Sequence, residues 1–236
     1  MNVRKQFSFK NHILSALPAD SLERLMPHLE HVELPLGKNL YRAREPISHV
    51  YFPENAMASI VATTAEGQCT EIGVVGREGA VGLEVLMGVD SSPHECMIQI
   101  PNSGYRLATA ALRTEFNLGG QVHDVLLNFI HKLMIQISQT TLCNRLHTLD
   151  ERLARWLLMC YDRVGGGQLN LTQEFLAIML GVSRVTVTLA ASELQTSGQI
   201  QYARGRINIT DRGGLEGSCC ECYQIVRSEY DGNGAK

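Results

Sequence analysis

The first half of the chain consists of short apolar runs separated by turn residues. Such runs occupy residues 50–52, 58–63 and 70–75, among others. Clusters that contain Pro, Gly, Asn or Ser lie between them, and these residues favour tight turns. Many short strands with regular turns predict a β sandwich or a small barrel. A short helical segment over residues 12–29 is expected to precede the strands.

The pattern changes between residues 120 and 147, where it predicts one long helix. Apolar, small and polar residues recur there in steps that alternate between four and three, which is the spacing of a coiled-coil seam. Polar residues late in this seam would set its register against a partner helix. We therefore expect a homodimer interface formed by Leu126, Ile130, Leu133, Ile137, Thr140 and Asn144. The alternative is a helix that packs on its own domain.

The last third of the chain alternates amphipathic helices with one hairpin. Residues 149–164 predict a helix ended by three glycines, and a final helix is expected over about residues 211–226. The patterns divide the chain into three parts: a β-rich domain over 1–118, a dimerisation helix with a hinge over 119–148, and a small domain over 149–236. The fold class is therefore α+β.

Residues 171–209 predict two short helices followed by a hairpin. Thr172 and Ser183 are each placed to cap the start of a helix, and Gly181 between the helices can adopt a left-handed turn conformation. This is the pattern of a helix-turn-helix, whose second helix enters the DNA major groove. The hairpin carries Arg204 and Arg206 on either side of its turn glycine. The segment therefore predicts a winged helix-turn-helix that binds double-stranded DNA.

The expected DNA contacts fall into two groups. The bases would be read from the start of the second helix, by Ser183, Arg184, Val185 and Thr188. Arg184 could donate two hydrogen bonds to a guanine, and Val185 could touch a thymine methyl group. The phosphates would be held by Thr172, Thr186, Arg204 and Arg206.

In this order and at this length, the three parts resemble the Crp/Fnr family of bacterial regulators. The resemblance is most specific at residues 180–184 and 202–206 and extends to the hinge at 146–150. It implies a jelly-roll domain like that of cyclic-nucleotide-binding proteins, and a dimer that binds a near-palindromic site with half-sites about one DNA turn apart. RNA polymerase is a further expected partner. However, Val185 and Leu189 stand where well-known members carry Glu and a second Arg, so the familiar target sequence is not expected.

The resemblance also locates an effector pocket. Family members that bind a cyclic nucleotide hold the ribose with a Gly-Glu pair and the phosphate with an Arg followed by Ser or Thr. Here Glu84 comes one place late, and His94 and Glu95 stand where Arg and Ser are needed. A one-place shift on a strand turns a side chain to the other face, and a carboxylate repels a phosphate. Cyclic AMP is therefore not expected as effector; a remaining pocket would be lined by Gly82, Glu84, His94, Gln139 and Thr140.

The seven cysteines do not indicate a secreted disulfide framework, because their number is odd and they are scattered. None precedes Cys69, so the N-terminal ligands of the iron–sulfur cluster found in some Crp/Fnr members are missing. Cys219, Cys220 and Cys222 cluster, but they fall in the predicted last helix, whereas structural zinc sites normally draw ligands from two segments. No metal is therefore predicted. Cys143 could cross-link two protomers on oxidation.

The net charge and the absence of catalytic motifs limit the functional classes to which the protein could belong. The net charge is −3, so any DNA contact must come from a local basic surface. The eight histidines are dispersed and no nucleophile or phosphate-binding motif is present, so no enzymatic activity is expected. No signal peptide or membrane span is evident, which predicts a cytoplasmic protein. The alternative function is a ligand- or redox-sensing interaction module whose C-terminal domain does not read DNA.

Overall fold

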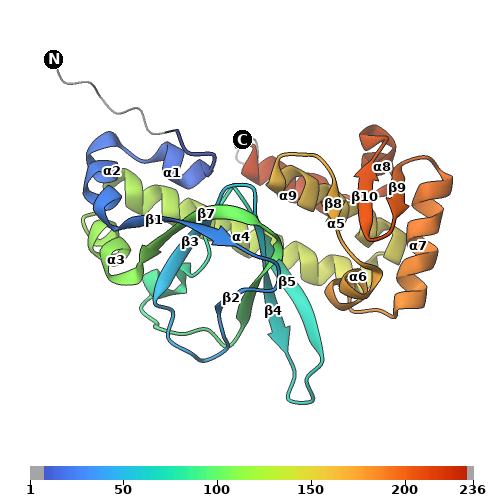
Figure 1. Cartoon of the computed structure of the whole chain (residues 1–236), viewed down its shortest axis with the longest axis horizontal. Helices are drawn as coiled ribbons and strands as arrows, with labels where there is room; N and C mark the ends of the chain where they lie inside the picture. The colour runs from blue at the N-terminus through green and yellow to red at the C-terminus, as the bar shows by residue number, and fades with distance from the viewer. Residues whose placement is uncertain (1–7, 233–236) are drawn as a thin grey trace.

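The computed structural model describes residues 8–232 (Figure 1). Its N-terminal part contains two antiparallel sheets. One has the strand order β1 (Leu29–Leu34), β7 (Asn102–Ala108) and β3 (His49–Pro53). The other has the order β2 (Asn39–Tyr41), β6 (Glu95–Ile100), β4 (Met57–Thr63) and β5 (Cys69–Val75). Buried side chains of both sheets join one apolar core, among them Leu34, Phe52, Ile98 and Leu107. The expected jelly-roll type of domain is confirmed.

Short helices surround these sheets. They are α1 (His12–Ala16), α2 (Ala19–Leu25), and the 3-10 turns η1 (Met26–His28) and η2 (Leu83–Met87). The helical opening predicted over residues 12–29 is therefore broken, and it ends before the start of β1. Pro18 is the reason, because proline disfavours a helical conformation at the preceding residue, and Leu17 is extended with ψ 143°. A further helix, α3 (Thr109–Asn117), follows β7.

Helix α4 (Gly120–Leu146) runs along the N-terminal domain and leads to the C-terminal part (Figure 1). It ends where predicted, because His147 is extended. Helix α5 (Leu149–Val164) starts at once with a capping box: the Thr148 hydroxyl accepts from the amide of Glu151, whose carboxylate accepts from the amide of Thr148. The helix ends at Gly165, which has φ 81°. Local capping chemistry thus fixes the boundary between α4 and α5.

The C-terminal part contains the predicted helix-turn-helix and hairpin. Its elements are β8 (Leu169–Asn170), α6 (Gln173–Leu180), α7 (Arg184–Thr196), β9 (Ile200–Ala203), β10 (Arg206–Ile209), α8 (Arg212–Ser218) and α9 (Cys222–Tyr230). The short strands form a sheet of order β8-β10-β9. Within residues 8–232 no single helix is long and apolar enough to cross a membrane; only α6 and α7 taken together pass on length and composition, across a 104° bend.

The prediction of one last helix over residues 211–226 is wrong. The chain forms two helices, and Cys219 between them is extended with ψ 158°. The first of the two, α8, contains three glycines in seven residues, and glycine costs about 1 kcal/mol relative to alanine inside a helix. The helix therefore stops early, which places Cys220 and Cys222 at a break rather than on a continuous helical surface.

The two domains share a buried boundary. Met57, Val74 and Ile100 come from the N-terminal sheet but belong to the apolar core of the C-terminal part. Polar contacts cross the same boundary: the Trp156 indole donates to Glu71 over 2.7 Å, and Nε of Arg163 lies 2.9 Å from a carboxylate oxygen of Glu78. The packing of this sheet against α5 therefore joins the domains by both apolar and polar contacts.

Candidate DNA-binding site

The helix-turn-helix is built by local capping. The Thr172 hydroxyl accepts a hydrogen bond from the Phe175 amide at the start of α6, and the Ser183 hydroxyl accepts one from the Thr186 amide at the start of α7, each over 3.2 Å. Gly181 ends α6 with φ 64°, in the left-handed region that glycine adopts at no steric cost. These caps set the angle at which α7 leaves the turn.

The two faces of α7 differ sharply. Its inner face is buried in the C-terminal core through Val187, Ala190, Ala191 and Leu194. Its outer face exposes Val185 at 70% and Leu189 at 64%. An exposed apolar pair on a short helix is unusual for a surface that faces only water, and it fits contact with thymine methyl groups. Leu189 was not among the contacts predicted from sequence, although its spacing of four from Val185 was a usable signal.

The candidate base-reading arginine is held by a neighbour. Arg184 forms an ion pair with Glu174 of α6 over 2.6 Å, and both side chains are about 60% exposed. Exposed pairs of this kind contribute about 0–1 kcal/mol, so Arg184 can leave its partner at little cost. The Thr188 hydroxyl donates to the Arg184 carbonyl, and the Ser183 and Thr186 hydroxyls lie 2.7 Å apart. Ser183, Arg184, Thr186 and Thr188 therefore lie together at the start of α7.

The hairpin between β9 and β10 is a tight two-residue turn. Ala203 pairs with Arg206, while Arg204 and Gly205 have φ of 51° and 74°. Two successive positive φ values define a type I′ turn, which matches the twist of hairpin strands. The Tyr202 hydroxyl donates to the Leu171 carbonyl over 3.0 Å and so ties the hairpin to the segment before α6.

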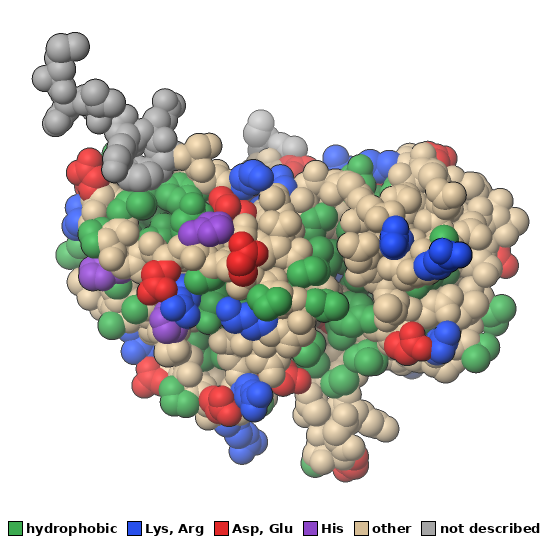
Figure 2. Space-filling model, in the orientation of Figure 1, with side chains coloured by type: hydrophobic (Ala, Val, Ile, Leu, Met, Phe, Trp, Pro, Cys, Tyr) green, Lys and Arg blue, Asp and Glu red, His purple; other side chains and the backbone are tan. Residues whose placement is uncertain are grey.

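A groove of about 340 Å³ lies between the hairpin and the two helices, lined by Thr172, Gln173, Glu174, Arg184, Tyr202, Arg204 and Gly205. The structure therefore brings together three of the predicted contacts, Thr172, Arg184 and Arg204. Arg206 and Thr186 are exposed on neighbouring positions. Figure 2 shows basic and acidic side chains interspersed over the face in view, in keeping with the net charge of −3.

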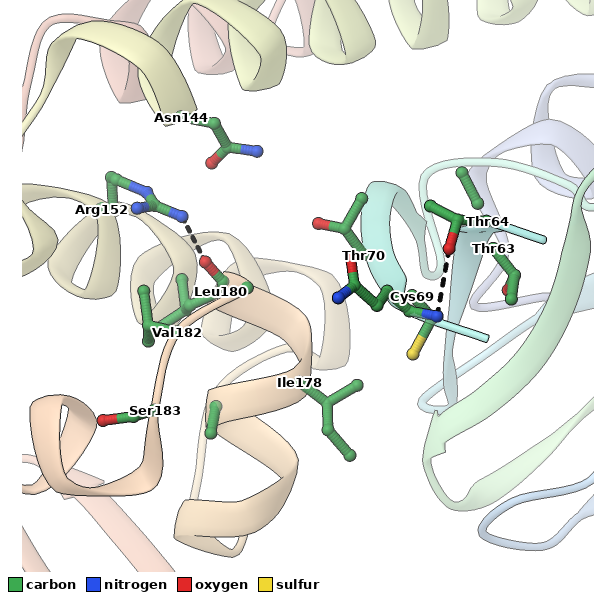
Figure 3. Close-up of a pocket in the computed structure, with 14 residues that line it drawn as sticks. Thr63, Thr64, Cys69, Thr70, Asn144, Arg152, Ile178, Leu180, Val182 and Ser183 are labelled. Carbon is green, nitrogen blue, oxygen red and sulfur yellow. Dashed lines mark hydrogen bonds between the residues drawn. The ribbon is translucent and has the colours of Figure 1, made fainter. Parts of the chain in front are cut away.

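A second groove, of about 890 Å³, separates the β4–β5 hairpin from the helix-turn-helix (Figure 3). Thr63, Thr64, Cys69 and Thr70 lie on the hairpin side. On the other side, Arg152 donates to the carbonyl of Leu180 at the end of α6. Asn144, which was expected in the dimer seam, lines this groove, as does Ser183. The start of α7 therefore stands close to the N-terminal domain.

The stripe of α4 expected to face a partner is partly covered by its own chain, which corrects the prediction for Leu126 and Thr140. Leu126 is 0% exposed in the core of its own domain. Leu133 and Ile137 stand against Gly73 of β5, where an added Cβ would lie 3.5 and 3.4 Å from their side chains. Thr140 is 9% exposed and accepts from Arg155, while Ile130 packs against the N-terminal core. The unpartnered face of α4 instead carries Leu127, Met134, Leu142 and Leu146.

The expected effector residues take part in separate contacts. Gly82 has φ 93°, and an added Cβ would lie 3.0 Å from the His49 carbonyl. Glu84 accepts from the buried Tyr41 hydroxyl over 2.8 Å, and His94 is half-buried. Gln139 and Thr140 lie on α4, where Thr140 is used by Arg155. Nothing about these contacts identifies a ligand.

A buried carboxyl group occupies the domain boundary instead. Glu71 receives the Trp156 indole hydrogen bond, and its other oxygen lies 2.5 Å from the Ser59 hydroxyl, which is also 2.5 Å from Gln99 Oε1. Burial raises the pKa of Glu71 to about 7, against the opposing effect of these hydrogen bonds. A hydroxyl has one proton to donate, so a protonated Glu71 that donates to Ser59 satisfies both short contacts.

A known domain family and several solved structures share parts of this architecture. The Crp-like helix-turn-helix domain family matches residues 151–217. The fold is similar to FixK2 from Bradyrhizobium japonicum, with a TM-score of 0.70 and 20% identity over 81% of this chain and 98% of that chain. It is also similar to the c-di-GMP-responsive global regulator CLP of Xanthomonas campestris (TM-score 0.65, 17% identity, 81% and 99% covered). TTHB099, a CRP-family regulator from Thermus thermophilus, gives a TM-score of 0.64 at 18% identity, with 82% and 99% covered.

A comparison with curated protein sequences gives no match. The resemblance to Crp/Fnr regulators that the sequence suggested is nevertheless confirmed, because the matched domain contains the helix-turn-helix and the shared fold extends over most of the chain. Residues 151–217 match the Crp-like helix-turn-helix domain family, and the chain has the fold of Crp/Fnr transcription regulators.

Proposed function

We propose that the protein is a cytoplasmic homodimer in which each α7 reads one half of a near-palindromic DNA site. One observation carries this proposal: Arg184 at the exposed start of α7 and Arg204 of the hairpin line a common groove, and Val185 is exposed next to Arg184. A helix start and an adjacent hairpin are the parts that winged helix-turn-helix proteins apply to the major groove and the phosphates. RNA polymerase, the further partner expected from the resemblance, stays a prediction.

The roles follow from exposure and chemistry. Arg184 would donate to a guanine, while Val185 and Leu189 would contact thymine methyl groups. Ser183 and Thr188 would lie along the same base edges. The groups assigned to the phosphates remain Thr172, Thr186, Arg204 and Arg206, whose side chains are partly or fully exposed or cap a helix start. Because apolar contacts replace the expected Glu and second Arg, A·T pairs should be favoured beside the guanine.

The dimer would form through the exposed stripe of α4. Leu127, Met134, Leu142 and Leu146 are 43%, 63%, 40% and 68% exposed. Their spacings of seven, eight and four residues keep them on one side of the helix. A repeated apolar stripe on an otherwise packed helix is typical of a surface that a second helix covers. A two-fold pair of such helices would present two copies of α7 to one DNA site.

DNA selection tests the reading role. Sites would be selected from a random pool with the purified full-length protein, and binding followed by fluorescence anisotropy at several salt concentrations. Arg184→Ala should weaken binding to the selected site by about 1–3 kcal/mol and relax one position per half-site. The control is Arg106→Ala, since Arg106 pairs with Glu30 far from the helix-turn-helix. An equal loss on every DNA sequence would refute base reading by Arg184.

The alternative function predicts a different result from the same experiment. A ligand- or redox-sensing module whose C-terminal domain served only protein contacts would show no salt-dependent DNA binding. The comparisons do not favour this alternative. Tight binding to a two-fold site by the protein alone would show that no added effector is needed.

A charge on the exposed stripe tests the dimer. Met134→Glu should convert the dimer to a monomer in analytical ultracentrifugation, because two carboxylates would meet across the two-fold axis. Met87→Glu is the matched control, since Met87 is 57% exposed on η2 of the N-terminal domain. A wild-type protein that sediments as a monomer, or a Met134→Glu protein that remains dimeric, would contradict the proposed interface.

A further inference from the structure

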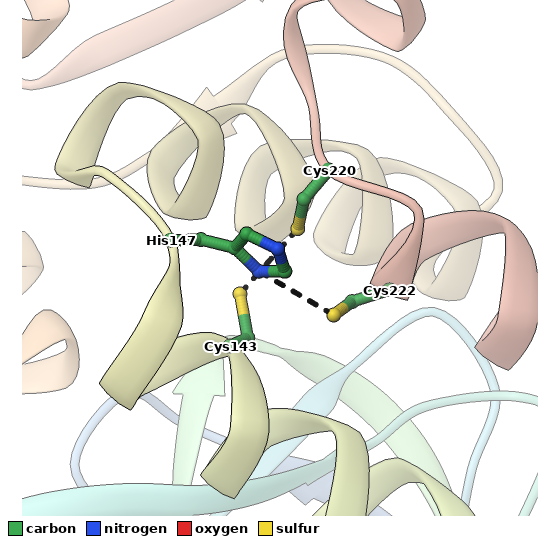
Figure 4. A group of neighbouring side chains, drawn as sticks. All are labelled: Cys143, His147, Cys220 and Cys222. Atoms are coloured by element: carbon green, nitrogen blue, oxygen red, sulfur yellow. Dashed lines mark hydrogen bonds between the residues drawn. The ribbon is translucent and has the colours of Figure 1, made fainter.

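Four side chains of the types that commonly bind metal ions, three cysteines and one histidine, lie close together at the end of α4 (Figure 4). Cys143 and His147 come from the last turn of α4 and the residue after it. Cys220 and Cys222 come from the break between α8 and α9. One ligand atom from each of the four lies within 4.8 Å of all the others. The three cysteines are 0%, 4% and 0% exposed, so the cluster is closed to solvent on most sides.

The spacing of these atoms fits a single tetrahedral ion. Zinc holds thiolate sulfur at about 2.3 Å and imidazole nitrogen at about 2.0 Å, so neighbouring corners of its tetrahedron lie about 3.5–3.8 Å apart. The Sγ atoms of Cys143 and Cys220 are 3.5 Å apart, and Cys222 Sγ is 3.6 Å from His147 Nδ1. An iron–sulfur cluster distributes its four protein ligands over two or four irons, so ligands on different irons lie farther apart than these atoms do.

The composition of the cluster is that of a structural zinc site. Three cysteines and one histidine are an established zinc ligand set, and such sites take ligands from separate segments. No metal was predicted from sequence, because Cys220 and Cys222 had no second segment to complete a site. The structure supplies that segment from α4, 75 residues away in the case of His147 and Cys222.

The imidazole is oriented as a ligand requires. Nδ1 of His147 points to the sulfurs, and its Nε2 lies 3.4 Å from a carboxylate oxygen of Glu221. A carboxylate behind the outer nitrogen fixes the ring tautomer and raises the basicity of the metal-facing nitrogen. Glu221 is 67% exposed and lies between the two cysteine ligands in the chain, so the same segment supplies ligands and support.

The charge around the cluster provides a separate argument. Arg155 of α5 is 4% exposed, and its guanidinium donates to the Thr140 hydroxyl and the Met159 sulfur rather than to a carboxylate among the described residues. Its charge acts on both Cys143 and Cys222. Its charge also acts on the buried Glu71, whose own burial favours the neutral form. A buried cation needs a counter-charge, because its desolvation is costly. Zn²⁺ with three thiolates and a neutral imidazole carries a net charge of about −1, which Arg155 would balance.

We propose that Cys143, His147, Cys220 and Cys222 bind one Zn²⁺ ion, which fastens the end of α4 to the start of α9. Binding displaces the three thiol protons to solvent and forms three Zn–S bonds and one Zn–N bond, with no change of oxidation state. Because the site spans the junction at residues 147–148, the ion holds the DNA-binding domain at one angle to α4. This proposal does not depend on the DNA-reading roles assigned above.

Metal analysis of the full-length protein tests the site directly. Protein purified under reducing conditions should contain about one zinc per chain by mass spectrometry of the elements. Cys220→Ser and Cys222→Ser should each lose most of that zinc. Cys219→Ser is the matched control and should keep it, because Cys219 Sγ instead donates to the Glu216 carbonyl. Equal zinc loss in all three variants, or iron with labile sulfide in the wild type, would overturn the proposal.

A second measurement covers variants that fail to fold. Co²⁺ added to the metal-depleted wild-type protein should give the visible bands of tetrahedral cobalt and the near-ultraviolet bands of thiolate ligation, and zinc should abolish them. Glu221→Gln should keep these bands while lowering zinc affinity about 10–100-fold. Failure of the wild type to bind either metal with all its thiols reduced would refute the site. A disulfide between Cys143 and Cys220 in freshly purified protein would also refute it.

Discussion

The proposed DNA-reading surface and the boundary between the two domains are built in opposite ways. The reading surface comes from one stretch, residues 172–206, and its key side chains are exposed. The boundary is assembled from β5, α4, α5 and the start of α9, and its polar side chains are buried. A surface for DNA needs groups that are free to change partners, whereas a boundary needs every buried group satisfied.

The arginines of the two regions show this difference most clearly. Arg184 shares an exposed ion pair with Glu174, which contributes about 0–1 kcal/mol. Arg163 is 6% exposed, lies 2.9 Å from Glu78, and also donates to Gln136 of α4. Removing one partner of a buried pair leaves an uncompensated charge. The same residue type is therefore free to change partners in one region and held at a domain boundary in the other.

The largest effect is expected from Arg163→Ala. It should lower the free energy of unfolding by about 3–5 kcal/mol, because Glu78 would stay buried without its partner. Urea unfolding followed by circular dichroism would measure the loss. Arg206→Ala on the hairpin is the control and should stay within about 0.5 kcal/mol of wild type. A loss below about 1 kcal/mol for Arg163→Ala would show that an arginine at the domain boundary contributes no more to stability than one on the surface.

The second effect concerns pH at the same boundary. The pKa of Glu71 is about 7 in the folded protein against an ordinary 4.5, so the folded state binds this proton more tightly. Its contribution to stability is fully present below about pH 4.5 and is lost as pH rises through 7. The wild-type protein should lose up to about 3 kcal/mol of its free energy of unfolding between pH 5 and pH 8 through Glu71. The Glu71→Gln protein should not show this loss, because a glutamine side chain cannot ionise.

Unfolding of wild type, Glu71→Gln and Glu66→Gln at both pH values would check this effect. Glu66 is the control because it is an exposed residue of the β4–β5 turn. The difference between wild type and Glu71→Gln is the measured quantity, since other carboxyl groups titrate equally in both. Identical pH profiles for these two proteins would mean that Glu71 is ionised in the folded state.

The third effect tests whether the exposed apolar side chains of α7, Val185 and Leu189, contact thymine methyl groups. Val185→Ala should cost about 1 kcal/mol of binding free energy on the selected site, through a lost methyl contact. Replacing the contacted thymine by deoxyuridine should cost wild type about the same amount but leave Val185→Ala unaffected. Losses that simply add would show that Val185 and this methyl group do not touch.

The smallest effect is expected from Glu174→Gln. The change frees Arg184 from its ion pair and removes a negative charge from the groove beside the hairpin. DNA affinity should rise by less than about 1 kcal/mol, with stability unchanged within about 0.5 kcal/mol. Titrations at low and high salt would separate the charge effect, which salt screens. Weaker DNA binding would indicate that Glu174 itself contacts a base.

Sequence alone determined the elements whose signals are local. Thr172 and Ser183 cap the helices that they were expected to start, and the glycines expected to end α5 and α6, Gly165 and Gly181, do so. The candidate reading residues follow from these caps, because they occupy fixed positions along α7. Helix capping depends on residues within three or four positions of each other, so it can be predicted from the local sequence.

The tertiary structure decided which side of each element is covered. The heptad pattern of α4 predicted a seam, but β5 packs on that seam, since Gly73 lets the backbone approach Leu133 and Ile137. Likewise, the early end of α8 carries Cys220 and Cys222 to Cys143 and His147. Hydrophobic periodicity in a sequence predicts that a helix has an apolar face, but not which part of the protein packs against that face. Contacts between segments far apart in the chain form only when the protein folds into a packed core.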